Sequence, residues 1–515
     1  MCGIAVAINW DGADSAVQRL ISGMLHRGDV TDPLVMIGNN VAMCTRRLRI
    51  VDAAHGVQPQ ASFDERFLVS FNGEIYNHVE LRRELETLGV RFRTECDTEV
   101  IANVLRAWGT AGIKRLSGMY AFVAVDTASG DFLAARDPFG VKPLYLTLSP
   151  KGILFCSEIQ PLLEATESDE VVLLPPGHTL TSNFCGRHYD LPSPTVLSSD
   201  SPRKLDRILS EAVRIRMPSD LPVAALFSGG IDSTLVMHYA RRFRPDIPGY
   251  IAVGRNAPDH VYAKRYAEES GLDLREVPIE AHGAKTLSLI KTVVNAVEAF
   301  EPAVIRSGLH TYLVSQRIHQ DGFRVALCGE GADELFAGYS PLEYAFMKSN
   351  SVGRYVQKQC LSMMHRANLQ RVDRCSMQFQ LEIREPFLDQ SVVSYASELD
   401  VSDLVKQTDG APVGKAPLRA LYDLYPSDLP KFIRDRQKVA FHEGAGGNSA
   451  GSDWLDLFEA ELTDADLEDG RREFADFKIA TKEELFCLRI LATKMDVTRI
   501  PHLCARLRLD MPLAA

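Results

Sequence analysis

Residues 191–202, LPSPTVLSSDSP, interrupt the pattern of this chain more clearly than any other stretch. Pro and Ser dominate the segment and it has no apolar periodicity, which is typical of a linker. The parts on either side are each long enough to bury a hydrophobic core. We therefore predict two domains, residues 1–190 and residues 205–515, joined by a linker at residues 191–204.

The composition is that of a globular protein, because 46% of the residues are hydrophobic and 24% are charged. A formal net charge of -11 disfavours nucleic acid and anionic membrane surfaces as partners. No stretch has the roughly 18 consecutive apolar residues of a membrane span, and the first residues lack the basic segment of a signal peptide. The ten cysteines contain no CxxC pair, so neither a disulfide framework nor a zinc site is indicated. We expect a cytoplasmic protein with reduced thiols.

Short apolar segments separated by turn residues make up much of the first part. Strands are predicted at residues 4–8, 67–71, 120–125 and 153–156, and turns at Asn72-Gly73 and Ser129-Gly130-Asp131. Helical segments are expected at about 78–89 and 97–108. This pattern predicts sheets with helices packed against them.

Strands alternate with helices in the second part. The apolar run 222–227 leads into a Ser-Gly-Gly turn and a helix at 233–243. Residues 249–253 precede another predicted helix at about 260–270, and the strand 324–328 precedes a second glycine-rich turn. Such alternation predicts an α/β domain with a parallel sheet. The C-terminal end of the chain also looks helical, but no motif there indicates a role.

Cys2 is unusual because of its position. Removal of Met1 is plausible before a small residue and would expose an α-amine on the cysteine. The thiol is an intrinsically strong nucleophile, and an amine with a reference pKa of about 8 can act as a general base beside it. The alternative is a small buried residue at the head of the strand 4–8.

Other polar residues of the first part could build a site around such a nucleophile. Asn72 and Gly73 could direct a side-chain amide and a backbone N–H at one point, as an oxyanion hole requires, or could form an ordinary turn. Arg47 with an acidic residue could hold the carboxylate and ammonium of a free amino acid. Asp97 could be that acid or could cap a helix.

A series of motifs in the first part occurs in a fixed order. They are MCGIAVA at 1–7, RRLRIVD at 46–52, FNGEIYN at 71–77, DTEV at 97–100, LSGMYAFVAVD at 116–126 and ARDPFGVKPLY at 135–145. On these motifs, residues 1–190 resemble the glutaminase domain of class II, or N-terminal-nucleophile (Ntn), glutamine amidotransferases. The resemblance implies an αββα sandwich. One departure is HRGDVTDP at 26–33, where the family usually has HRGPD.

The same resemblance implies a role for several residues of the first part. Cys2 would attack the side-chain amide of glutamine, and Asn72 and Gly73 would form the oxyanion hole. The residues expected to bind glutamine are Arg47, Asn72, Glu74 and Asp97.

Two glycine-rich turns follow predicted strands of the second part. In SGGIDS, residues 228–233, backbone N–H groups and a helix N-terminus would cradle a phosphate, and Asp232 could serve a Mg²⁺ ion bound to it. In CGEGADE, residues 328–334, three carboxylates follow the strand. Turns at the carboxyl ends of neighbouring parallel strands line one crevice, and carboxylates facing phosphates require a cation between them. The alternatives are an ordinary turn and an acidic surface loop.

The motifs SGGIDS, CGEGADELFAGY, DRCSM, EIREPFLD and RQKVAF also occur in order. Residues 205–445 therefore resemble the synthetase domain of glutamine-dependent asparagine synthetases, which belong to the ATP pyrophosphatase (PP-loop) group. The resemblance implies that ATP adenylates a carboxylate and releases pyrophosphate. Ammonia from the first domain would then displace AMP, through an internal passage, to form an amide. A homodimer is expected by resemblance only.

The resemblance also implies residue roles in the second part. ATP would be bound by Leu226, Ser228, Gly229, Gly230, Asp232, Ser233, Val253 and Gly329. Asp232 and Asp333 would hold Mg²⁺. Glu330 and Lys438 would lie at the reacting centre, where a lysine would stabilise the departing pyrophosphate. Arg306 and Glu330 would bind the acceptor.

The acceptor is expected to be aspartate or a related carboxylate. β-Lactam synthetases share the architecture, but by resemblance they usually lack the N-terminal cysteine and carry Tyr in place of Glu330. Cys2 and Glu330 therefore favour amide formation from glutamine. Residues 303–310, AVIRSGLH, lack hydroxyls that some relatives have, and lost polar contacts can change substrate choice. A different carboxylate, an amide-forming enzyme similar to β-lactam synthetases and a non-catalytic scaffold remain the alternatives.

Overall fold

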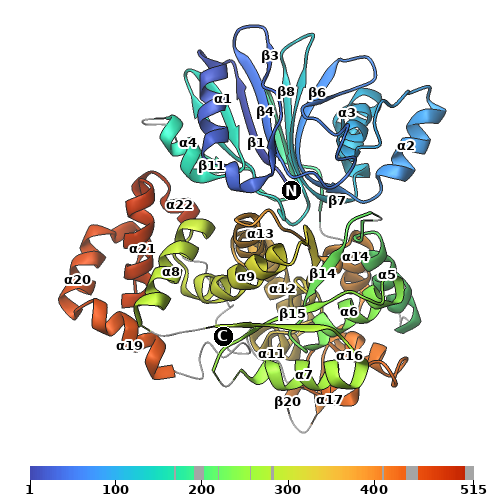
Figure 1. Cartoon of the computed structure of the whole chain (residues 1–515), viewed down its shortest axis with the longest axis vertical. Coiled ribbons are helices and arrows are strands. Elements are labelled where there is room, and N and C mark those ends of the chain that lie inside the picture. Colours follow the sequence, from blue (N-terminus) through green and yellow to red (C-terminus); the bar gives the residue numbers. More distant parts are fainter. Residues whose placement is uncertain are drawn as a thin grey trace. The chain divides into compact units, whose positions relative to one another are not determined.

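The computed structural model describes residues 1–166, 170–190, 202–218, 220–255, 257–279, 283–408, 411–436 and 451–504. The chain divides into two compact units (Figure 1). The first unit contains Met1–Asp190, Met377–Gln380 and Leu488–Ala505. The second contains Leu191–Ser376, Leu381–Cys487 and Arg506–Ala515.

Two antiparallel sheets form the centre of the first unit. One has the strand order β11-β9-β10-β1-β4-β2, with β3 also paired to β4, and the other has the order β13-β12-β8-β7-β6-β5. The strands of the first sheet are β1 (Gly3–Ile8), β2 (Val30–Thr31), β3 (Val35–Ile37), β4 (Val41–Arg47), β9 (Tyr145–Ser149), β10 (Gly152–Cys156) and β11 (Val171–Leu173). Those of the second are β5 (Gln60–Ala61), β6 (Phe67–Ile75), β7 (Gly118–Asp126), β8 (Phe132–Arg136), β12 (His178–Thr181) and β13 (Cys185–Arg187).

Alternating side chains divide each sheet between two apolar layers. Val6, Met43 and Phe155 from the first sheet meet Val123 and Ala134 from the second in one buried cluster. The opposite face of the second sheet packs against α2 (His78–Thr87) and α3 (Asp97–Trp108), and α1 (Ala13–Ser22) covers the first sheet, with α4 (Ile159–Ala165) beside it (Figure 1). This layering is the αββα sandwich expected from the sequence.

Asn72 and Gly73 lie inside a strand, so the predicted turn at this point is wrong. β6 pairs with β7 over its whole length, and Gly73 lies opposite Tyr120. A continuous ladder of this length overrides the turn preference of an Asn-Gly pair. A Cβ atom on Gly73 would lie 2.0 Å from the carbonyl oxygen of Met119, so the close approach of the strands requires glycine here.

A parallel sheet with the strand order β16-β15-β14-β17-β18 forms the centre of the second unit, and every adjacent pair is parallel. The predicted α/β organisation is therefore confirmed. The strands are β14 (Val223–Leu226), β15 (Gly249–Val253), β16 (Leu274–Pro278), β17 (Val325–Leu327) and β18 (Glu382–Arg384). A separate hairpin joins β19 (Lys406–Thr408) to β20 (Ala411–Val413).

Helices pack on this sheet and extend beyond it. Side chains of α9 and α13 share a buried cluster with the sheet. The helices are α5 (Pro202–Arg214), α6 (Ile231–Phe243), α7 (Pro258–Ser270), α8 (Gly283–Val297), α9 (Pro302–Gln320), α10 (Ala332–Leu335), α11 (Ser340–Lys348), α12 (Asn350–Met363), α13 (Asn368–Met377), α14 (Gln390–Glu398), α15 (Val401–Leu404), α16 (Ala416–Tyr422) and α17 (Lys431–Arg434). The C-terminal elements are α19 (Gly451–Glu461), α20 (Asp464–Glu473), α21 (Lys482–Lys494), the 3₁₀ helix η6 (Val497–Arg499) and α22 (Pro501–Cys504).

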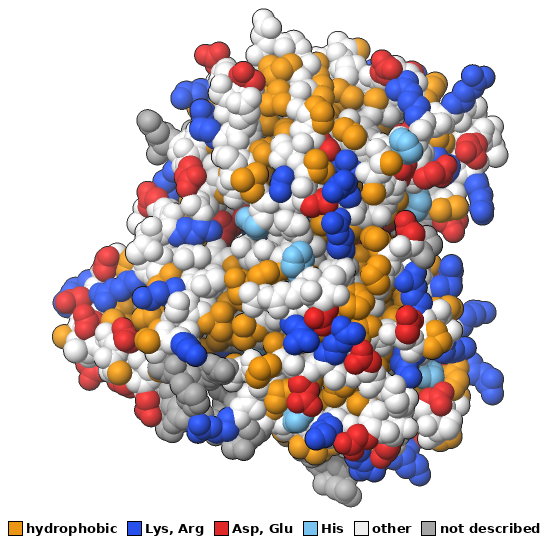
Figure 2. All heavy atoms as spheres, viewed as in Figure 1, with side chains coloured by type: hydrophobic (Ala, Val, Ile, Leu, Met, Phe, Trp, Pro, Cys, Tyr) orange, Lys and Arg blue, Asp and Glu red, His pale blue; other side chains and the backbone are white. Residues whose placement is uncertain are grey.

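The surface carries charges of both signs (Figure 2), and the described cysteines are not joined to one another. Figure 2 shows acidic and basic side chains interspersed over the visible face. Within the part of the chain that the structure describes, no helix combines the length and apolar character needed to cross a membrane. All ten cysteines lie among the described residues and none forms a disulfide.

We predict a pH dependence of stability from His188. Its ring contacts the Tyr120 hydroxyl at 3.1 Å and the Thr179 hydroxyl at 3.0 Å, and burial lowers the pKa of His188 from 6.5 to about 4. The unfolded chain binds this proton more tightly, so the free energy of unfolding should fall as pH decreases from 6.5 towards about 4. In urea unfolding, the free energy of unfolding of His188→Gln should fall less with decreasing pH than that of the unsubstituted protein. The His55 side chain is 72% exposed, so His55→Gln should keep the full fall. Equal pH slopes in both variants would contradict the prediction.

Candidate functional sites

Cys2 lies directly before β1 and is held through its main chain. The residue is only 6% exposed. Its backbone N–H donates to Asn72 Oδ1 at 2.8 Å, and its carbonyl oxygen accepts from Arg27 Nε at 3.0 Å. Ile4, two residues further along the chain in β1, is fixed as well, because its N–H donates to Ser157 Oγ at 2.9 Å. These contacts leave little freedom for the position of the cysteine.

β6 supplies the next residues of this site. Asn72 is fully buried, and its Nδ2 has no hydrogen-bond partner among the described residues. Because Asn72 Oδ1 accepts from Cys2, the orientation of the amide group is fixed and Nδ2 remains available as a donor. Buried donors without a partner are rare in folded proteins. A donor of this kind beside a thiol fits a site that stabilises an oxyanion. Gly73 follows directly, and Glu74 is also buried.

Arg47 and Asp97 approach the same region from other elements. Gly3 pairs with Arg46, so one further step along the register brings Arg47 opposite Cys2. Arg47 Nε donates to Asp32 Oδ2 at 2.9 Å, and Asp32 lies in the segment that departs from the family pattern. Asp97 begins α3, and its Oδ2 accepts from the N–H of Ile75, next to Glu74, at 2.9 Å. The structure thus places Arg47 opposite Cys2 on the neighbouring strand, and Asp97 beside the end of β6, the strand that carries Asn72, Gly73 and Glu74.

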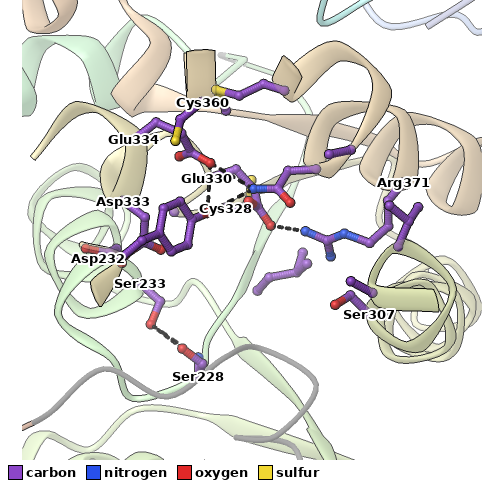
Figure 3. Close-up of a pocket in the computed structure, with 18 of the residues that line it drawn as sticks. Ser228, Asp232, Ser233, Ser307, Cys328, Glu330, Asp333, Glu334, Cys360 and Arg371 are labelled. Atoms are coloured by element: carbon purple, nitrogen blue, oxygen red, sulfur yellow. Dashed lines mark hydrogen bonds and ion pairs between the residues drawn. The ribbon is translucent and has the colours of Figure 1, made fainter. Parts of the chain in front are cut away.

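The second site is a cavity of about 750 Å³ at the carboxyl ends of β14, β15 and β17. Both glycine-rich turns contribute to its wall, as expected for turns that follow parallel strands. Figure 3 shows side chains from the two turns, together with Ser307 and Arg371, arranged around one space. Its lining includes Leu226, Ser228, Asp232, Ser233, Gly329, Glu330 and Asp333 of the predicted residues.

The turn Ser228–Ser233 joins β14 to α6. Ser228 Oγ lies 3.1 Å from Ser233 Oγ, and Ser228 N–H donates to the same hydroxyl at 3.2 Å. α6 begins directly after Gly230, so the N–H groups of its first turn face this loop. Arg436 fixes the loop from outside by donating to the carbonyl oxygens of Ser228 and Gly229, at 3.4 Å and 3.2 Å. N–H groups of this loop and of the first turn of α6 can therefore bind an anion.

The two turns meet at Gly329. A Cβ atom there would lie 2.9 Å from Cβ of Asp232, so glycine allows the second turn to pack on the first. Lys415 Nζ lies 2.6 Å from Asp232 Oδ2 and 2.5 Å from Asp333 Oδ1. The two carboxylates predicted to share a cation therefore face one point. Lys415 could not be predicted from the sequence, because no motif surrounds it.

The other carboxylates of the cavity differ in their partners. Glu330 forms an ion pair with Arg371, which also donates to Thr311 Oγ1 at 2.7 Å. Glu334 accepts from the Tyr339 hydroxyl at 2.8 Å and from Asn368 at 3.0 Å. Burial and the nearby negative charges raise the pKa of Glu334 to about 7. Arg371 and Asn368 were also missed, because their partners are distant in sequence.

Three other residues predicted for the second site are Arg306, Val253 and Lys438, of which the first two lie outside the lining of the larger cavity. Arg306 does not line the larger cavity; its Nε donates to Glu483 Oε1 at 2.9 Å beside a second cavity of about 540 Å³. The contact of Arg306 with the acceptor stays a prediction. Val253 ends β15 directly after Ala252, which lines the larger cavity. Lys438 lies outside the described residues.

We predict that Lys415 is required to keep Asp232 and Asp333 together. Loss of one partner from a buried ion pair leaves uncompensated charge, so Lys415→Met should lower the free energy of unfolding by about 3 kcal/mol in urea titrations. Lys406→Met, which removes an exposed ammonium, is the control. Asp232→Asn should recover part of the loss in the Lys415→Met background. Equal effects of the two lysine substitutions would contradict this prediction.

Comparisons with known proteins agree with this arrangement. Residues 1–178 match a family described as a glutamine amidotransferase domain, and residues 204–356 and 345–483 match the asparagine synthase family. Asparagine synthetase [glutamine-hydrolyzing] 1 of Arabidopsis thaliana is 32% identical over 88% of this chain and 79% of its own length. The corresponding enzyme 2 of Lotus japonicus is 32% identical over 87% and 78%, and that of Zea mays is 30% identical over 96% and 86%. The chain therefore belongs to the asparagine synthase family, with a glutamine amidotransferase domain before its synthase domain.

Proposed function

We propose that this protein is a glutamine-hydrolysing asparagine synthetase. It would hydrolyse glutamine in the first unit, adenylate aspartate with Mg-ATP in the second, and combine the ammonia with the aspartyl group to release asparagine, AMP and pyrophosphate. The observation that carries the proposal is the geometry at Cys2. A buried cysteine bonded to Asn72, whose amide nitrogen remains available, is arranged for attack on an amide. The relatives named above support aspartate as the acceptor.

In the first unit, the thiolate of Cys2 would attack the carbon of the glutamine side-chain amide. After removal of Met1, the α-amine of Cys2 can take the thiol proton and pass it to the leaving nitrogen. Asn72 Nδ2 and the Gly73 N–H would stabilise the negative oxygen that forms. Collapse of this adduct releases ammonia and leaves a thioester, which water hydrolyses to glutamate.

Substrate binding in the first unit needs groups for both ends of a free amino acid. Arg47 would bind the α-carboxylate of glutamine, and Asp97 would bind its α-ammonium group. Asn72 and Glu74 would also contact the bound glutamine. Two observations support that division: Arg47 on β4 lies opposite Cys2, and Asp97 at the start of α3 accepts from the N–H of Ile75, next to Glu74.

In the second unit, the turn Ser228–Ser233 would hold the phosphates of ATP through Ser228, Gly229, Gly230 and Ser233. Leu226, Val253 and Gly329 would flank the rest of the nucleotide. Asp232 and Asp333 fit Mg²⁺, because two oxygen ligands face the one point that the Lys415 ammonium contacts. Mg²⁺ would take its other ligands from phosphates and water. Bound Mg²⁺ would neutralise phosphate charge.

Glu330 is the residue that we propose at the reacting centre. Its carboxylate lines the cavity and is oriented by Arg371, so it can accept the proton that ammonia loses as it attacks the acyl group. Lys438 would stabilise the departing pyrophosphate. We also propose that the protein acts in the cytoplasm, which accords with ten cysteines outside any disulfide, and that it can form a homodimer.

The first test is Cys2→Ala. This change should abolish glutamine hydrolysis and glutamine-dependent amide synthesis, because it removes the nucleophile. Synthesis from added ammonia should persist, since the second site is intact. Cys185→Ala, which removes the exposed cysteine of the first unit, should leave both activities unchanged. Loss of ammonia-dependent synthesis in Cys2→Ala would show that the two reactions do not occupy separate sites.

The second test identifies the acceptor. The protein is incubated with glutamine, Mg-ATP and one carboxylate at a time, and pyrophosphate and amide are measured together. Aspartate should give equal amounts of asparagine and pyrophosphate. Pyrophosphate formation with a different acid but not with aspartate would overturn the assigned acceptor, whereas none with any acid would overturn the synthetase activity.

A further inference from the structure

We propose that the C-terminal segment Val497–Cys504 is part of the glutaminase unit and that Arg499 is a positioning residue for Cys2. The inference rests on the proposed role of Cys2 as the nucleophile. Residues 497–504 lie outside both ranges that match known families, since these end at residues 178 and 483. The structure groups this segment with the first unit.

Arg499 holds the C-terminal end of α4. Its guanidinium donates to the carbonyl oxygens of Leu163 and Thr166, at 3.1 Å and 2.9 Å, and to the Thr166 hydroxyl at 3.0 Å. The last carbonyls of a helix have no partners within it, and a positive charge there is favourable. The Thr166 hydroxyl caps only the Leu162 carbonyl, at 3.0 Å, so Arg499 supplies from a distant part of the chain the donors for the Leu163 and Thr166 carbonyls.

The rest of the segment is anchored beside this cap. Val497, Ile500 and Cys504 are buried. His502 Nε2 donates to the carbonyl oxygen of Val171 in β11 at 3.0 Å. In Figure 1 the helix α22 lies beside α4 and β11. The segment is thus a fixed support.

The opposite end of α4 holds the nucleophile. Glu158 directly precedes the helix, and its carboxylate accepts from Arg27 at 3.2 Å. Arg27 is fully buried and donates to the carbonyl oxygen of Cys2. The adjacent Ser157 accepts from Ile4 N–H. Two hydrogen bonds therefore depend on the position of the residues that lead into α4: the bond from Arg27 to the Cys2 carbonyl and the bond from Ile4 N–H to Ser157.

α4 is short enough for its two ends to be coupled. A helix of seven residues is not stable without tertiary contacts, so release of its C-terminal end should also loosen Glu158. Arg27 would then lose the partner that fixes its charge, and the carbonyl of Cys2 would lose its donor. Small displacements of a reacting group can reduce the rate by as much as about 100-fold. Arg499 therefore acts on the reaction through α4, Glu158 and Arg27.

The test compares Arg499→Ala with Arg471→Ala. Arg471 makes similar bonds in the second unit, to the carbonyl oxygens of Ile479 and Ala480 at 3.2 Å and 3.0 Å. Arg499→Ala should lower kcat for glutamine hydrolysis about 10-fold with little change in KM. Ammonia-dependent synthesis should be unchanged. Arg471→Ala should not alter glutamine hydrolysis, and Arg499→Lys should recover part of the lost rate because it keeps a cation at the helix end.

A second measurement does not depend on turnover. Iodoacetamide labelling of Cys2, followed by mass spectrometry with the exposed Cys185 as internal reference, should change in rate in Arg499→Ala and not in Arg471→Ala. Wild-type labelling and wild-type kcat in Arg499→Ala would overturn the proposal. A parallel loss of ammonia-dependent synthesis would also overturn it, because that result indicates general misfolding. If the wild-type protein does not hydrolyse glutamine, the proposed function fails, and the labelling still decides whether Arg499 positions Cys2.

Discussion

The ammonium of Lys415, shared by Asp232 and Asp333, is the contact on which the cavity of the second unit depends. The parallel sheet brings two glycine-rich turns together, and each turn carries a carboxylate to the meeting point. Without a cation these groups would repel one another in a region shielded from water. Glu330 is neutralised in the same way by Arg371. For Glu334, burial and the nearby negative charges raise the pKa to about 7, which disfavours its charged form. Of these four carboxylates one is buried and three are partly buried, and the nearby cations offset the cost of removing their charges from water.

The first unit achieves its geometry by other means. Cys2 is placed mainly by hydrogen bonds of its main chain, to Asn72 on one side and Arg27 on the other. β6, which carries Asn72, and β1, which follows Cys2, each pair over long ladders, so the position of Cys2 follows from the register of two packed sheets. The site is therefore preorganised by the fold, while the cavity of the second unit is held together by charge.

Much of this arrangement could be predicted from local sequence. The alternation of strands and helices predicted the parallel sheet, and the helix at 97–108 agrees with α3. The Asn72-Gly73 turn was wrong because pairing with β7 overrides the local preference. Lys415 could not be found from sequence, since Asp232 lies 183 residues away and no pattern marks either as a pair. The ion pair of Arg306 with Glu483, 177 residues further along the chain, could not be found from sequence for the same reason.

The register of β1 has a consequence for how this protein can fail. Side chains of a strand alternate between faces, so a slip of one residue would move Val6 from the cluster between the sheets to the layer under α1 and would also move Cys2 away from Asn72. Poor packing and a misplaced thiol would then arise from the same error. A damaged first unit should be unfolded and degraded rather than persist as a well-folded protein that consumes glutamine without product.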